Sequence, residues 1–234
     1  MHNFVIDKVS SIFKAKRWQL FMDWHIPRHG ESILDLGGGD GGHLAELYPY
    51  PENIILADID GDIINAGVNK YGLNSSLLLD ECGDIPLDSK SIDIVFCNSV
   101  IEHATIDKKC IWELKDGRKF KELALIRQAK MAREIMRVGK KYWVQTPYRH
   151  FLFETHTWLP ATQYLPRILL VETIKFFNRF WIKKTSPDFY LLSVTEARAL
   201  FPNAEIIFEK VYGLPKSLII RSPIQTKNDV KSML

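Results

Sequence analysis

The stretch Ser32–Gly42, SILDLGGGDGG, decides the fold. A mostly apolar run leads directly into glycines at positions 37, 39 and 41, and the residues that follow favour a helix. Glycine lacks a Cβ atom, so such a loop can reverse direction tightly and let a ligand contact the backbone. The pattern predicts a buried strand, a tight loop and a helix whose first N–H groups face a ligand.

The alternation of strand and helix continues along the chain. Besides 32–36, apolar runs predict buried strands at 53–57, 76–79, 92–97 and 141–145. Helices are expected at 4–24, 42–48, 62–71, 99–113, 120–137 and 195–200, and an antiparallel strand pair at 204–210 and 217–221. The pattern predicts an α/β fold, Rossmann-like and doubly wound, with a mostly parallel seven-stranded sheet and a C-terminal antiparallel strand pair.

The length of 234 residues suits a single domain. We expect an N-terminal helix over residues 1–30 and a core that binds the ligand over 31–147. A helical lid insert on the acceptor side is expected over 148–190, and a terminal helix with the strand pair over 191–234. The three cysteines form no CxxC pair, so no metal site is expected and a reducing compartment is the default. No signal peptide or long apolar run is evident, which predicts a soluble, cytoplasmic protein.

A carboxylate follows the glycine loop at the spacing that a nucleoside requires. Asp58 ends the second strand, 23 residues after Asp35, where it would accept hydrogen bonds from both ribose hydroxyls. Position 40 within the glycine loop is Asp, and the negative charges of Asp35 and Asp40 would repel the pyrophosphate of a dinucleotide. Residues 31–98 carry thirteen acidic side chains against two lysines, which favours a cationic ligand.

On these residues the chain resembles class I S-adenosylmethionine-dependent methyltransferases. ILDLGGGDGG matches their first motif, IILADID looks like the second, and CGDIPLDSKSIDIVFCNSVIEH is similar to the later motifs. The resemblance implies S-adenosyl-L-methionine as the cofactor. It implies that Asp35 binds the ammonium, that Gly37, Gly39 and Gly41 contact the cofactor through the loop, and that Asp58 binds the ribose. It places Ile59, Asp84 and Ile85 at the adenine and Asn98 on the sulfonium side.

Three residues are candidates for catalysis. His103 follows Glu102 just past the fourth strand and resembles a Glu-His pair of small-molecule methyltransferases, although a half-buried helix residue would fit as well. Glu154 and His156 lie two residues apart after the fifth strand, so in an extended chain they would point to the same side. They either line the acceptor pocket or pack within the loop.

The segment 166–184, PRILLVETIKFFNRFWIKK, is apolar and basic. Such a helix can form a lid on its own domain, a peripheral contact with a membrane or lipid-linked acceptor, or a homodimer contact. Arg149, Arg167 and Lys175 are candidates to meet an anionic acceptor.

The expected function is methyl transfer, by O-methylation of a small molecule or a glycan/lipid-type intermediate. The sequence at 98–101, Asn-Ser-Val-Ile, lacks the Asn-Pro-Pro-aromatic motif that holds a flipped base, which disfavours nucleic acid. The basic helix at 120–141 leaves an RNA-modifying methyltransferase as one alternative. An aminopropyl transferase or nicotinamide enzyme and a non-catalytic nucleoside-cofactor-binding regulator are the others.

Overall fold

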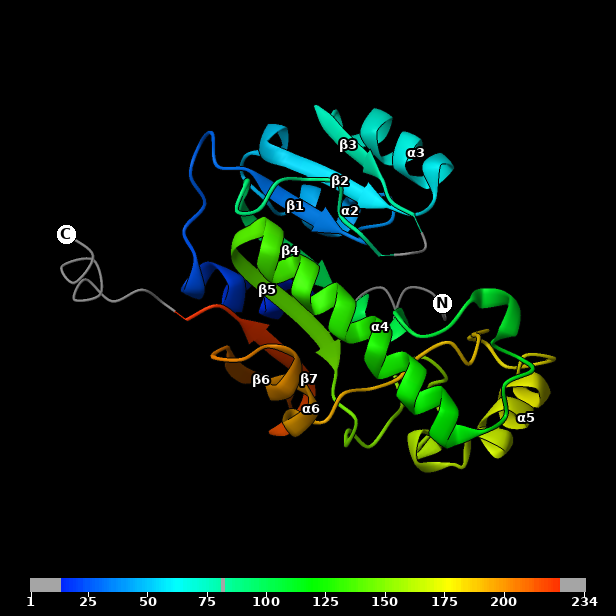
Figure 1. Ribbon diagram of the computed structural model, residues 1–234. Coiled ribbons are helices and arrows are strands. Elements are labelled where there is room, and N and C mark those ends of the chain that lie inside the picture. The colour runs from blue at the N-terminus through cyan, green and yellow to red at the C-terminus, as the bar shows by residue number, and fades with distance from the viewer. Residues whose placement is uncertain (1–13, 81–82, 224–234) are drawn as a thin grey trace.

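The computed structural model describes residues 14–80 and 83–223. Its strands form one sheet in the order β3-β2-β1-β4-β5-β7-β6 (Figure 1). Strands β1 to β5 run parallel, and β7 lies antiparallel between β5 and β6. The strand bounds are Ile33–Leu36, Ile54–Asp58, Ser75–Leu78, Ile92–Asn98, Gly139–Pro147, Glu205–Val211 and Leu214–Arg221 for β1 to β7. The architecture confirms the predicted α/β fold.

Helices cover both faces of the sheet. Along β1 and β4 alternate side chains point to opposite faces, as a period of two requires. Leu34 and Val95 pack with α4 and α6, whereas Ile33 and Ile94 pack with the helix at 14–24, α2 and α3. The bounds of α2 to α6 are Gly42–Ala45, Gly61–Tyr71, Gly117–Val138, Arg167–Phe177 and Val194–Leu200. Of the N-terminal helix expected at 4–24, residues 4–13 lie outside the described residues.

Local signals fix the ends of the helix that follows β2. The Asp60 carboxylate accepts hydrogen bonds from the N–H groups of Asp62 and Ile63 and caps the start of α3. Gly72 ends α3 at φ 64°, in the left-handed conformation that glycine adopts without a Cβ penalty. The predicted helix at 62–71 and its glycine cap are therefore confirmed.

The helix expected at 99–113 is wrong. Ser99 has φ 56°, which bends the chain sharply after β4, and only the short 3₁₀ turns Ile101–His103 (η2) and Lys108–Cys110 (η3) follow. Asp107 caps the second turn through the N–H of Lys109. The buried Ile101, Ile106 and Ile111 recur every five residues, a spacing that does not fit one helical face.

The basic, apolar helix is shorter than the predicted 166–184, because α5 ends at Phe177. Figure 1 shows α5 beyond the sheet, near the start of α4. Leu170 and Ile174 of α5 pack against Phe189 and Leu191, so one face of this helix lies on its own domain. No helix among the described residues is both long and apolar enough to span a bilayer.

Candidate functional site

A cavity of about 360 Å³ lies at the carboxyl ends of β1, β2 and β4. In open α/β sheets ligands bind at this edge, where the strand order reverses between neighbouring strands, here β1 and β4. The predicted residues in its wall are Gly37, Asp58, Ile59, Ile85 and His103. The fold therefore brings together residues from all three motifs that the sequence analysis singled out.

At two positions of the glycine loop after β1, there is no room for a side chain. Gly37 has φ 71°, and a Cβ atom there would clash with the side chain of Val100. A Cβ at Gly38 would clash with the Asp35 carboxylate. Gly39 and Gly41 also have positive φ. The loop therefore follows a path beside the cavity that other residues could not take without strain.

Asp35 lies beneath this loop with its carboxylate nearly inaccessible, at 2% exposure. Its Oδ2 atom has no hydrogen-bond partner among the described residues. Burial, together with the negative charges of Asp58 and Asp40, raises the pKa of the carboxyl to about 7. An unpartnered buried carboxylate is costly, and a cationic ligand group would relieve that cost.

Asp58 is held toward the cavity by backbone groups. Its carboxylate accepts hydrogen bonds from Gly39 N at 2.9 Å, Ile59 N at 2.7 Å and Asp60 N at 3.2 Å. A carboxylate has about four acceptor positions, so one remains for a ligand hydroxyl. The next residue, Ile59, exposes its side chain, and both residues line the cavity.

Two expectations at the adenine end need correction. The Asp84 carboxylate pairs with Lys130 Nζ at 2.9 Å and does not line the cavity. The N–H of Ile85 donates to Glu134 Oε2 at 2.9 Å, so it is not the free donor that was expected. Ile85 still contributes its buried side chain to the cavity wall.

Asn98 also lies elsewhere than expected. Its Oδ1 accepts a hydrogen bond from Arg17 Nη1 at 2.8 Å, and its side chain is not part of the cavity wall. The following residue, Ser99, lines the cavity instead, and its hydroxyl donates to Gln145 Oε1 at 2.7 Å. The left-handed conformation of Ser99 turns the chain away from the direction of β4, which the sequence pattern did not indicate.

The sequence analysis missed much of the opposite wall. The break in the expected helix lets short turns wrap around the cavity, and α4 closes it from one side. The missed residues are Leu36, Leu79, Asp80, Gly83, Ser99, Val100, Ala104, Ile106, Lys108, Ile111, Arg127, Lys130, Met131 and Asp188. The five-residue spacing of the isoleucines at 101, 106 and 111 is the available signal for this irregular wall.

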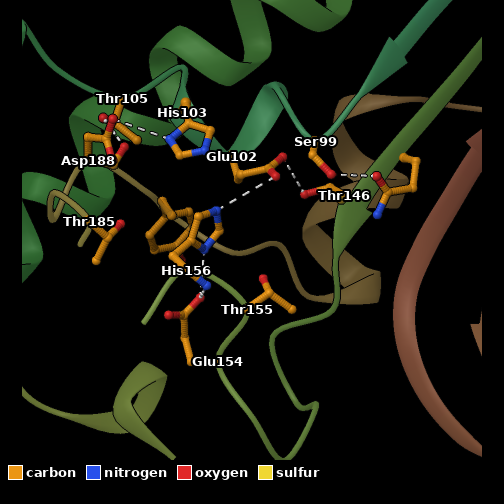
Figure 2. A network of polar contacts seen from close by, with 12 residues as sticks. Ser99, Glu102, His103, Thr105, Thr146, Glu154, Thr155, His156, Thr185 and Asp188 are labelled. Atoms are coloured by element: carbon orange, nitrogen blue, oxygen red, sulfur yellow. Dashed lines mark hydrogen bonds and ion pairs between the residues drawn. The ribbon is translucent and has the colours of Figure 1, made fainter. Parts of the chain in front are cut away.

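His103 stands at the junction of the cavity and a polar cluster (Figure 2). Its ring is about one-third exposed, and Nδ1 lies 3.3 Å from Asp188 Oδ2. Burial disfavours the protonated ring, but the contact with Asp188 and the charges of nearby carboxylates outweigh it and raise the pKa of His103. Asp188 comes from a segment 85 residues further on, so its partnership was not visible in the sequence.

Glu154 and His156 do contact each other, but through a turn rather than an extended strand. Glu154 Oε1 accepts from His156 N at 2.8 Å and lies 2.6 Å from His156 Nδ1. Burial alone would raise the pKa of Glu154, but these contacts outweigh it and lower the pKa. Neither side chain is in the cavity wall. The His156 ring instead stacks on Phe189 and meets the edge of His103, with centroids 4.9 Å apart.

The basic candidates for an anionic acceptor are engaged elsewhere. Arg167 is buried, donates to the carbonyl oxygens of Ile111, Leu114 and Pro187, and lies over the ring of Phe120. Its role in this structure is to hold α5 to the domain. Arg149 forms an ion pair with Glu196 at 3.2 Å, and Lys175 pairs with Glu172 within α5.

Comparisons with known proteins find one family model and several solved structures that are similar to parts of this chain. Residues 33–116 match the model of the methyltransferase domain family. No curated protein matches the sequence significantly.

Solved structures share the fold at low sequence identity. The PH0226 protein from Pyrococcus horikoshii OT3 is 17% identical, with 89% of each chain covered and a TM-score of 0.56. A putative S-adenosylmethionine-dependent methyltransferase from Listeria monocytogenes is 12% identical, with 91% of this chain and 99% of that chain covered and a TM-score of 0.55. A SAM-dependent methyltransferase from Methanosarcina mazei is 12% identical, with 88% of this chain and 98% of that chain covered and a TM-score of 0.53.

The matched family segment runs from β1 through η3 and contains the glycine loop, Asp58 and His103. It therefore includes the main predicted elements of the cavity wall, and it agrees with the expected enzyme class. Residues 33–116 therefore match a methyltransferase domain.

Proposed function

We propose that the chain transfers the methyl group to an oxygen atom of a small molecule or a glycan/lipid-type intermediate, and that the cavity binds both cofactor and acceptor. The observation that carries this proposal is the continuity of the cavity. It reaches from Gly37 and Asp58 on one side to His103 and Asp188 on the other. Donor and acceptor can therefore meet within one site, as in-line transfer requires.

The residues on the cofactor side fit S-adenosylmethionine. The unpartnered Asp35 oxygen would receive the ammonium, Asp58 has an acceptor position for a ribose hydroxyl, and Ile59 and Ile85 offer apolar contacts to adenine. Gly37, Gly39 and Gly41 keep the loop close to the ligand. Bound there, the cofactor supplies an activated methyl group on a sulfonium. Asp84 and Asn98 contribute indirectly, through Lys130 and through the position of Ser99.

The acceptor side combines an apolar wall with one polar edge. Val100, Ala104, Ile106 and Met131 exclude water, while His103 brings a hydrogen-bonding ring to the wall. Among the three candidates for catalysis, His103 is the one that reaches the cavity. His156 and Glu154 stand behind it as positioning residues. An acceptor with an apolar body and a hydroxyl group fits this arrangement.

Among the roles considered for the segment 166–184, contact with a lipid-linked acceptor or a membrane fits the structure better than a lid does. Within the described chain, no residue of 166–184 lines the cavity, so this segment does not cover the cofactor. α5 and its extension instead expose five large apolar side chains: Ile168, Leu169, Phe176, Phe180 and Ile182. Large exposed apolar patches beside basic side chains are typical of surfaces that meet anionic membranes.

RNA is the less favoured acceptor, because much of the positive charge on α4 is already paired. Lys121, Lys130 and Arg137 form ion pairs with Glu196, Asp84 and Glu134. Phosphate contacts would have to replace these pairs.

The test is turnover of cofactor carrying a labelled methyl group, with lipid, polar-metabolite and RNA fractions of a cell extract offered separately. The proposal expects label in the lipid or small-molecule fraction, as a methyl ether or ester by mass spectrometry. Label confined to RNA, or on nitrogen or carbon, would overturn the acceptor assignment. Cofactor binding without turnover on any fraction would instead indicate a regulator.

A further inference from the structure

A second site lies behind the cavity wall, where Glu102, His103 and His156 converge (Figure 2). Their ligand atoms all lie within 4.8 Å of one another. Glu102 and His103 come from η2, and His156 comes from the turn after β5, 53 residues later. No cysteine belongs to the cluster, so the cysteine spacing could not reveal it.

One carboxylate oxygen of Glu102 is left without a hydrogen bond among the described residues. Its side chain is fully buried, and Thr146 Oγ1 donates to Oε2 at 2.9 Å. Oε1 has no hydrogen-bond partner among the described residues and lies 3.9 Å from His156 Nε2, beyond hydrogen-bond distance. A buried carboxyl oxygen without a hydrogen bond is costly unless something binds it.

Both histidines have one ring nitrogen fixed by a carboxylate, which leaves the other nitrogen for a ligand. Nδ1 of His156 lies 2.6 Å from Glu154 Oε1, and Nδ1 of His103 lies 3.3 Å from Asp188 Oδ2. In metal sites a carboxylate typically holds the second ring N–H of each histidine ligand in this way. Figure 2 shows the remaining nitrogens of both rings on the side of Glu102.

The surroundings favour a cation. Glu102, Glu154 and Asp188 place three carboxylates around two imidazoles. Lys183 is the near basic residue, and its ammonium donates to the backbone oxygen of Thr155. Negative charge therefore exceeds positive charge within the cluster.

We propose that Glu102, His103 and His156 bind one divalent zinc ion, with Glu154 and Asp188 as the carboxylates that orient the two histidines. Two imidazoles and a carboxylate are a common zinc ligand set that leaves a fourth position open. With zinc–ligand bonds of about 2.1 Å at tetrahedral angles, neighbouring ligand atoms are about 3.4 Å apart. Small side-chain rotations would bring the three ligand atoms from their present separations to this distance.

The experiment measures zinc content and affinity of the full chain, independently of methyl transfer. After dialysis against chelator, the protein is loaded with zinc, passed over gel filtration and analysed for metal. The proposal expects one zinc per chain and a rise in Tm of about 5–10 °C at a hundredfold excess of zinc over Kd.

Variants separate this site from adventitious binding. Glu102→Gln and His156→Gln should each weaken zinc binding at least 100-fold, and Glu154→Gln about 10- to 100-fold. His29→Gln, at an exposed histidine far from the cluster, should change nothing. Thermal unfolding in the presence of chelator shows whether each variant is folded. If Glu102→Gln does not fold, His156→Gln still tests the site, because the His156 side chain is partly exposed.

Absence of zinc after loading, or zinc binding that persists in both Glu102→Gln and His156→Gln, would overturn the proposal. Because cofactor binding is a separate titration, failure of the metal site is distinguishable from failure of the proposed reaction.

Discussion

Asp35 places the requirements of folding and of ligand binding in opposition. Its carboxylate is buried beneath the glycine loop with one unpartnered oxygen, which the ligand-free protein can tolerate most easily when the group is protonated. In the proposed function, the same oxygen binds the ligand ammonium. On that proposal the residue lowers the stability of the free protein and raises cofactor affinity, as residues in binding sites often do.

Asp35→Asn should stabilise the ligand-free protein at alkaline pH. The folded carboxyl keeps its proton up to a pKa of about 7, whereas the ordinary pKa of this side chain is 3.8. Between these values the folded state binds more protons than the unfolded state, so the contribution of Asp35 to stability falls as pH rises. At pH 8 the variant should gain up to about 4 kcal/mol, and near pH 3.5 nothing.

Urea unfolding of ligand-free wild type and variant at both pH values measures this difference. Asp23→Asn, at an exposed carboxylate, is the matched control and should show no comparable gain. An equal effect of Asp35→Asn at both pH values would refute the account of its burial.

The same variant should bind the cofactor more weakly. Replacing a charged hydrogen-bond partner by a neutral one costs about 1.5–3 kcal/mol, which corresponds to a roughly 10- to 100-fold higher Kd. Calorimetric titration with S-adenosylhomocysteine at pH 8 tests this. An unchanged Kd would show that Asp35 does not meet the ammonium.

At the scale of elements, Arg167 joins α5 to the rest of the domain. Arg167→Met should remove the donor from three carbonyl oxygens, two of them in buried hydrogen bonds, and remove the contact with the Phe120 ring. We expect a loss of about 2–4 kcal/mol and a fall in Tm of about 5–15 °C. Lys175→Met on the same helix should leave Tm nearly unchanged, because its partner Glu172 is exposed. Equal effects of the two variants would contradict this role.

The open face of α5 should bind anionic vesicles. Flotation with phosphatidylcholine vesicles, with and without phosphatidylserine, should show binding that depends on phosphatidylserine and weakens with salt. Replacing Ile168, Leu169 and Phe176 by serine should reduce binding by at least about tenfold, because each loses apolar area. Ile126→Ser, at an exposed position on α4, is the control. A concentration-dependent dimer without vesicle binding would assign this face to self-association.

Strands were more predictable than the segments between them. The apolar runs before Gly37 and Asp58 are buried on both faces, so composition alone marks them as strands. The segment after β4 was mispredicted because a serine at φ 56° and a capping Asp107 break a sequence that otherwise favours helix. Glu102, Asp188 and His156 meet only in three dimensions, and no spacing in the chain reports their contact.

At the scale of the whole molecule, the order of the strands creates the site. Because β4 lies beside β1 on the side opposite β2, the chain after β1 and the chain after β4 leave the sheet in different directions. The cavity lies between them, and α4 with the 101–111 turns closes it. In the proposed function, predictable motifs supply the cofactor side of the cavity, whereas irregular segments supply the acceptor side.

Titration of S-adenosylhomocysteine into the full chain tests the central claim most directly, with Asp58→Ala and Asp62→Ala run in parallel. Both carboxylates belong to the same region, but only Asp58 lines the cavity. The account predicts one site per chain, a roughly 10- to 100-fold higher Kd for Asp58→Ala, and an unchanged Kd for Asp62→Ala. Wild type that fails to bind, or binding that Asp58→Ala leaves intact, would contradict it.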